Sequence, residues 1–92
     1  MSVVVAPEAE DDLVAAVDFL SARNPDAAER LLDRAFALFR QLDAREFEGP
    51  AQRLSDGTLV RSWPLAPFRV YYQRRGSELV VLRVYHQARR PL

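Results

Sequence analysis

Residues 68–86 read FRVYYQRRGSELVVLRVYH, and this stretch decides how the rest of the chain is arranged. Apolar and polar side chains alternate from Phe68 to Gln73, which is the period of a strand with one buried face. A glycine-containing loop over residues 74–78 follows, and residues 79–86 form the most apolar stretch of all. Two such runs joined by a short loop predict a β-hairpin.

The pairing expected within this hairpin follows from its loop. If the loop closes symmetrically, three pairs share the core face: Phe68 with Val84, Val70 with Leu82 and Tyr72 with Val80. On the other face Arg69 is expected opposite Arg83, beside Tyr71 and Tyr85. Like charges directly opposite each other destabilise a sheet, so this face is expected to meet an anionic partner or a nearby carboxylate. Arg61, on the preceding strand, joins the face if the register permits.

A solvated sheet face is the alternative explanation for these arginines, because their stems can cover apolar surface while their charged heads stay in water. Exposed tyrosines ringed by arginine are, however, typical of protein interfaces. The group as a whole is therefore predicted to bind another macromolecule.

Two amphipathic helices are expected before the hairpin. Pro7 fits the first position of one helix, and the carboxylates that follow it complement the helix dipole. Asn24 is predicted to cap a second helix that begins at Pro25. The link between the two is short, so they are expected to form an antiparallel helical hairpin. Phe36 widens the apolar stripe of the second helix, which suggests that it contacts something besides the first.

Shorter strands complete the predicted fold. Residues 3–5 form a β-branched run, residues 58–63 read as a strand halted by Pro64, and residues 49–57 read as a loop. The predicted order is β-α-α-β-β-β. This is an α+β fold in which the N-terminal helical hairpin packs on one face of a small antiparallel sheet.

The composition is that of one folded domain over residues 1–92, since 49% of the residues are hydrophobic and 28% are charged. The chain has no cysteine and one histidine, so no disulfide, metal site or cofactor is expected. No stretch approaches the length of a membrane span, and the first residues do not form a basic segment followed by a long apolar run, so no secretory leader is expected. A cytoplasmic protein that does not enter the membrane is therefore expected.

The formal net charge of zero conceals a division of the chain. Residues 1–48 hold 11 acids and 5 arginines, a charge of −6, whereas residues 49–92 hold 2 acids and 8 arginines, a charge of +6. All 13 basic residues are arginine, which binds carboxylates and phosphates through paired hydrogen bonds. A neutral chain with one positive half fits a partner-binding protein better than a general nucleic-acid binder.

Three segments of the C-terminal half carry a family resemblance: RSWPL over 61–65, FRVYY over 68–72, and VLRVYHQARR over 81–90. Together with the Asn24-Pro25 junction and the order of elements, they resemble the RelE/ParE toxins of bacterial toxin–antitoxin pairs. The resemblance covers nearly the whole chain. It implies that a cognate antitoxin protein binds the toxin as a hetero-oligomer and holds it inactive.

The resemblance implies one of two activities. RelE-like members cut messenger RNA in the ribosomal A site, whereas ParE-like members poison DNA gyrase. For cleavage, the candidate catalytic residues are Arg69 and His86, although His86 also fits a strand-end histidine satisfied by a backbone carbonyl. The chain has no lysine and no tyrosine after His86, both of which the RelE branch uses. The sequence therefore favours a ParE-like inhibitor of gyrase that is not an enzyme.

A third possibility is an inactive member that only binds its antitoxin, as a transcriptional co-repressor. In each case the residues expected to contact a partner are Arg61, Arg69, Tyr71, Arg83, Tyr85, Arg89 and Arg90. An acidic antitoxin segment, extended or helical, is expected to lie on the open sheet face or in the groove of the helical hairpin.

Overall fold

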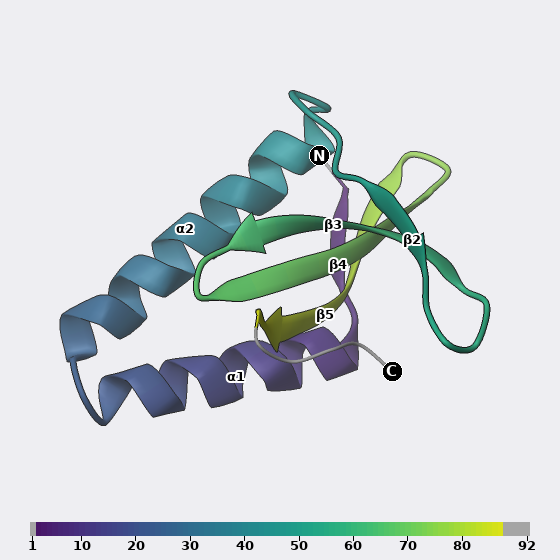
Figure 1. Cartoon of the computed structure of the whole chain (residues 1–92). Helices are drawn as coiled ribbons and strands as arrows, with labels where there is room; N and C mark the ends of the chain where they lie inside the picture. Colours follow the sequence, from purple (N-terminus) through teal and green to yellow (C-terminus); the bar gives the residue numbers. More distant parts are fainter. Residues whose placement is uncertain (1, 88–92) are drawn as a thin grey trace.

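The computed structural model describes residues 2–87, which form an α+β fold (Figure 1). Its elements are β1 (Val3–Val5), α1 (Pro7–Ser21), α2 (Pro25–Asp43), β2 (Ala51–Arg53), β3 (Leu59–Leu65), β4 (Phe68–Arg75) and β5 (Glu78–His86). The predicted fold class is confirmed, and so is the order of the predicted elements. One strand, β2, is added inside the segment that was predicted to be a loop.

Both helices begin at the predicted prolines. Pro7 opens α1 and Pro25 opens α2, and Asn24 caps α2 as expected. Its side-chain oxygen accepts hydrogen bonds from the backbone N–H groups of Asp26 and Ala27, at 3.1 and 3.2 Å. From their short link the two helices diverge as a V, and the sheet lies in its opening (Figure 1).

The sheet has five strands in the order β1-β5-β4-β3-β2. Strands β2 to β5 pair antiparallel with one another, but β1 runs parallel to β5. The sheet is therefore mixed, whereas a wholly antiparallel sheet was predicted. A parallel pair needs a long crossover connection, and here α1, α2 and the following strands lie between the two partners. The last strand of the chain therefore lies inside the sheet, with β1 on one side and β4 on the other.

The two strands before the hairpin differ from the prediction. Strand β3 does not stop at Pro64, which pairs with Arg69, but continues to Leu65. Residues 51–53 pair with residues 59–61 and form β2 at the edge of the sheet. Three residues without a β-branched or aromatic side chain carry no strand signal, which explains why β2 was missed.

The hairpin turn is shorter than the predicted one. Gly76 and Ser77 form a two-residue turn, and Arg75 pairs directly with Glu78. Gly76 has a φ of 60°, which suits glycine at the first central position of a tight hairpin turn. The predicted pairing was centred on Gly76, whereas the observed turn is centred between Gly76 and Ser77. Each residue of β4 next to the turn therefore pairs one residue further along β5 than predicted.

A β-bulge then shifts the register of β4 and β5 again. Tyr72 pairs with Val81 but Tyr71 pairs with Arg83, so Leu82 is the extra residue. Beyond the bulge Arg69 pairs with Tyr85. The prediction that Arg69 lies directly opposite Arg83 is therefore wrong, and so are the core pairs predicted with it.

The core lies between the helical hairpin and the sheet. Its buried members are Ala9, Leu13, Ala16, Leu31, Ala35, Leu38, Phe39, Leu42, Leu65, Phe68, Val70, Tyr72, Leu79, Val81 and Val84. Phe68, Val70 and Tyr72 are the predicted core face of β4, and this prediction is confirmed. Within residues 2–87 neither helix has the length and apolar character needed to cross a bilayer.

Candidate functional site

Arg69, Tyr71, Arg83 and Tyr85 share the sheet face opposite to the core, and together they form what we call the arginine–tyrosine face. The rings of Tyr71 and Tyr85 lie 5.6 Å apart between centroids, and the guanidinium carbon of Arg83 lies 4.4 Å from the centroid of Tyr85. Arg69 Nε donates a hydrogen bond of 2.9 Å to the buried Ser62 Oγ. The structure therefore brings these four predicted residues together, in a staggered arrangement.

Arg83 is held by a carboxylate from α1. Its Nε and Nη2 donate to the two oxygens of Asp12 at 2.8 and 3.1 Å, and this hydrogen bonding raises the pKa of Arg83. Asp12 Oδ2 also accepts the backbone N–H of Val84 at 2.9 Å, beyond the point where β1 stops pairing with β5. Asp12 thus supplies the carboxylate that the arginines were predicted to need, and it comes from the same chain.

Arg61 does not join the arginine–tyrosine face. It pairs with Tyr72, whose side chain lies in the core, so Arg61 lies on the same face as Tyr72 and opposite to the arginine–tyrosine face. Its Nη1 donates to the Gly49 carbonyl at 2.7 Å, and its Nε lies 3.9 Å from Glu48 Oε2. Arg61 was expected to join the arginine–tyrosine face only if the register permitted. The register does not permit it, because Ser62 and not Arg61 pairs with Tyr71.

Glu48 is the centre of a second polar cluster, which the sequence did not reveal. Its carboxylate accepts a hydrogen bond of 2.6 Å from Tyr72 Oη and two from Arg74, at 2.9 and 3.1 Å. Arg74 also donates to the Leu42 carbonyl at the end of α2, and Tyr72 Oη accepts the backbone N–H of Gly49. The cluster therefore ties the connection after α2 to strand β4.

The charges of this cluster shift the acidity of its members. The hydrogen bond from Arg74 is the main cause that lowers the pKa of Glu48, and burial is the main cause that raises the pKa of the Tyr72 hydroxyl. A carboxylate that accepts from an arginine and a tyrosine is stabilised in its charged form. Glu48 is therefore suited to be a fixed anion and not a proton acceptor near neutral pH.

The two candidate catalytic residues lie on opposite faces of the hairpin. His86 pairs with Phe68, and its ring lies edge-on to that core side chain with 5.6 Å between centroids. Arg69 is next to Phe68 in β4, so its side chain points to the other face. Arginine stays protonated and can only stabilise charge, so a site built from these two residues would need both side chains at the same phosphate, and they point away from each other. Among residues 2–87 no group of histidine, aspartate and glutamate side chains could hold a metal ion.

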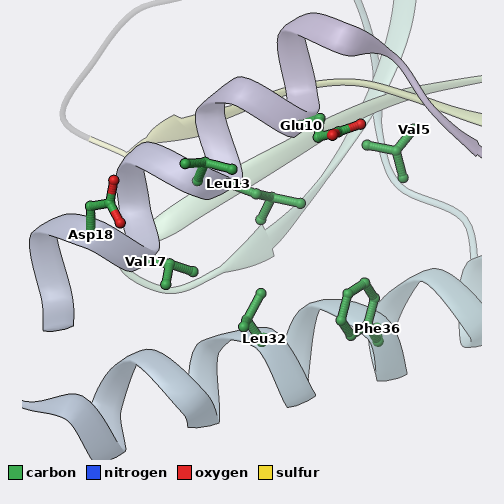
Figure 2. Close-up of a pocket in the computed structure, with 8 residues that line it drawn as sticks. Val5, Glu10, Leu13, Val17, Asp18, Leu32 and Phe36 are labelled. Carbon is green, nitrogen blue, oxygen red and sulfur yellow. The ribbon is translucent and has the colours of Figure 1, made fainter.

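An apolar groove lies between α1 and α2, with a volume of about 410 Å³ (Figure 2). The residues that line this helix groove are Val5, Glu10, Leu13, Val14, Val17, Asp18, Leu32 and Phe36. Val14 and Phe36 are 55% and 50% exposed, which is unusual for large apolar side chains of one small domain. Phe36 lies beside Val5 of β1 as well as beside α1, and half of its side chain stays exposed.

The charged groups of the helix groove are acidic. Glu10 lies toward the Val5 end and Asp18 toward the other end (Figure 2). These carboxylates disfavour an acidic segment in the groove, so of the two places expected for such a segment the arginine–tyrosine face suits it better. Arg89 and Arg90, which were also expected to contact a partner, lie outside the described residues.

Comparison with known proteins agrees with this architecture. The family model described as "ParE toxin of type II toxin-antitoxin system, parDE" matches residues 3–91. A solved structure of the chromosomal ParDE toxin–antitoxin system from P. aeruginosa is similar, with a TM-score of 0.72 and 25% sequence identity over 94% of this chain and 95% of that one. No curated protein matches. The chain therefore belongs to the ParE toxins of type II toxin–antitoxin systems.

Proposed function

We propose that this ParE-family toxin inhibits DNA gyrase by binding to it, acts in the cytoplasm, and is neutralised by a cognate antitoxin in a hetero-oligomer. The family match over residues 3–91 carries the proposal. The placement of Arg69 and His86 on opposite faces supports a binding mechanism, because ribosome-dependent cleavage of messenger RNA would need a proton-transferring group and a charge-stabilising group at the same phosphate.

The surfaces proposed for the partners follow from their composition. The arginine–tyrosine face offers cationic and aromatic groups, which are enriched where proteins bind each other. Tyr71 is buried and not exposed as expected, and it lies beside the half-buried Tyr85, so the two rings form the floor of this face. The half-buried guanidinium groups of Arg69 and Arg83 lie beside this floor, and their accessible part suits the acidic segment of a partner.

A supercoiling reaction with purified gyrase tests the target. We expect an excess of the toxin to reduce supercoiling, and an equimolar amount of the antitoxin to restore it. Supercoiling that stays unchanged at excess toxin would contradict the proposed target.

A reconstituted translation reaction tests the alternative in parallel. Messenger RNA that is cut at A-site codons in the presence of the toxin would replace gyrase inhibition with ribosome-dependent cleavage. Expression without the antitoxin tests the inactive co-repressor, because a growth arrest is incompatible with an inert protein.

A further inference from the structure

A second pocket, with a volume of about 450 Å³, lies next to the end of α2 and is lined in part by Arg61, so we call it the Arg61 pocket. Arg61 pairs with Ala51 on one side and with Tyr72 on the other, and Leu59 is two residues away in β3. These side chains therefore share the face of the sheet that is opposite to the arginine–tyrosine face. Leu59 is 53% exposed, so this end of the face is open. Pockets of this size commonly hold small molecules.

The Arg61 pocket has a surplus of positive charge. Its charged side chains are two arginines, Arg61 and Arg74, and one carboxylate, Glu48, a net charge of +1. The carboxylate already accepts two hydrogen bonds from Arg74 and one from Tyr72. Arg61 Nε lies 3.9 Å from Glu48 Oε2, which is too far for a hydrogen bond. The surplus charge is therefore on Arg61.

Arg61 is oriented by the backbone and keeps free donors. Its Nη1 donates to the Gly49 carbonyl at 2.7 Å. Gly49 is itself fixed, because its N–H donates to Tyr72 Oη and an added Cβ would lie 1.9 Å from the Ser62 carbonyl oxygen. In the described part of the chain Arg61 Nη2 donates no hydrogen bond, and 44% of the side chain is exposed. A guanidinium that is already positioned can bind an anion at a small cost in conformational entropy.

We infer that the Arg61 pocket binds a carboxylate that is carried on an apolar group. The free N–H groups of Arg61 take the carboxylate, and the exposed Leu59 with Ala51 takes the apolar group. A carboxylate fits better than a doubly charged phosphate, because the partly exposed Glu48 repels the second negative charge. Both a small organic acid and the C-terminus of a polypeptide with an apolar last residue carry this chemistry. The site can be occupied while a partner covers the arginine–tyrosine face, since the two lie on opposite sides of the sheet.

An NMR titration of the isotope-labelled full chain with isocaproate tests the inference. This acid combines a carboxylate with the branched apolar end of a leucine. We expect saturable shifts of the backbone amide signals of Leu59, Arg61 and Arg74. Isocaproamide lacks the charge and acetate lacks the apolar end, so each should bind about tenfold more weakly or less than that.

Variants at the pocket connect these shifts to the proposed contacts. Arg61→Gln should weaken the binding of isocaproate about tenfold, and Leu59→Ser about fivefold. Arg61→Lys keeps the charge without the paired donors and should bind between the wild type and Arg61→Gln. Arg53→Gln removes an exposed guanidinium of β2 that does not line the pocket, and it should bind like the wild type. Thermal unfolding of each variant shows that it is folded.

Two peptides separate the sources of the carboxylate: a short peptide that ends in leucine, and the same peptide with an amidated C-terminus. Binding of the free acid that is tighter than that of isocaproate would identify the end of a polypeptide as the ligand, and weaker binding would identify a small acid. Either result supports the site, provided that the amidated peptide binds less well. Equal shifts in the wild type and in both Arg61 variants would overturn the inference. Shifts confined to residues outside the pocket, or no shift with either acid, would also overturn it.

Discussion

Single carboxylates fix the geometry of this small protein. Asp12 joins α1 to the exposed edge of β5, and Glu48 joins the end of α2 to β4. Each binds an arginine that is far away in the sequence, and each also accepts a hydrogen bond from a second group. Both sites leave few polar groups unsatisfied, and within residues 2–87 no buried side-chain nitrogen or oxygen lacks a hydrogen-bond partner.

Glu48→Gln tests the second of these clusters. Glutamine can still accept from Tyr72 but loses the charge that faces Arg74, so we expect a loss of about 0.5–1 kcal/mol in the free energy of unfolding at neutral pH, limited by solvent screening of a partly exposed group. Because folding lowers the pKa of Glu48, this stability is present above the ordinary value of 4.5 and is lost as the pH falls through the lowered pKa.

Urea unfolding of both proteins between neutral and acid pH measures this difference. We expect the two stabilities to converge at acid pH, where wild-type Glu48 is protonated and also neutral. Glu46→Gln, at an exposed position nearby, serves as the control and should match the wild type throughout. A gap that persists unchanged at the lowest pH would show that the charge of Glu48 is not its cause.

At the level of elements, the sequence predicted those features that depend only on residues close together in the chain. Both helix starts and the core face of β4 follow from caps and from periodicity, and all are confirmed. The register of β4 and β5 was wrongly predicted for two reasons: the turn holds only two residues, and a bulge at Leu82 has no local signal in the sequence. For the same reason the Asp12–Arg83 pair was missed, since 71 residues separate its members.

The cap of α2 gives a prediction at this scale. Asn24→Ala removes the acceptor for two backbone N–H groups, and we expect it to lower the free energy of unfolding by about 1 kcal/mol. Asn24→Asp keeps an acceptor at the same place and should retain most of the stability. Thermal and urea unfolding of the three proteins provide the measurement. If alanine and aspartate destabilise equally, the side-chain cap does not contribute to the stability of α2.

For the whole molecule, the acidic N-terminal half and the basic C-terminal half of the chain form different layers, the helices and the sheet. The two helices hold nine acids and three arginines, whereas the strands hold six arginines and one acid, so the toxin presents two surfaces of opposite character. A partner that covers both must itself be divided in charge. A partner that binds only the sheet meets a cationic surface, and its association should weaken steeply as salt is added.

Arg69→Gln tests whether the arginine–tyrosine face is a shared contact. Arg69 is half-buried and bound to Ser62, so glutamine can keep one hydrogen bond while the charge is lost. We expect about tenfold weaker antitoxin binding and a matching loss of gyrase inhibition. Arg30→Gln, on the exposed side of α2, is the control. Unchanged affinity for both partners in a variant that melts like the wild type would exclude this face as a binding surface.

The position of β5 has a consequence for synthesis. Among the elements of residues 2–87 this strand is the last to be translated, yet β1, β4 and α1 all pack against it. Until then β1 has no strand to pair with, and the nascent polypeptide holds two helices without a completed core. Premature termination before β5 would therefore yield a fragment without a completed sheet. We expect that the interval in which a cell must have its neutralising protein ready begins only once β5 has been translated.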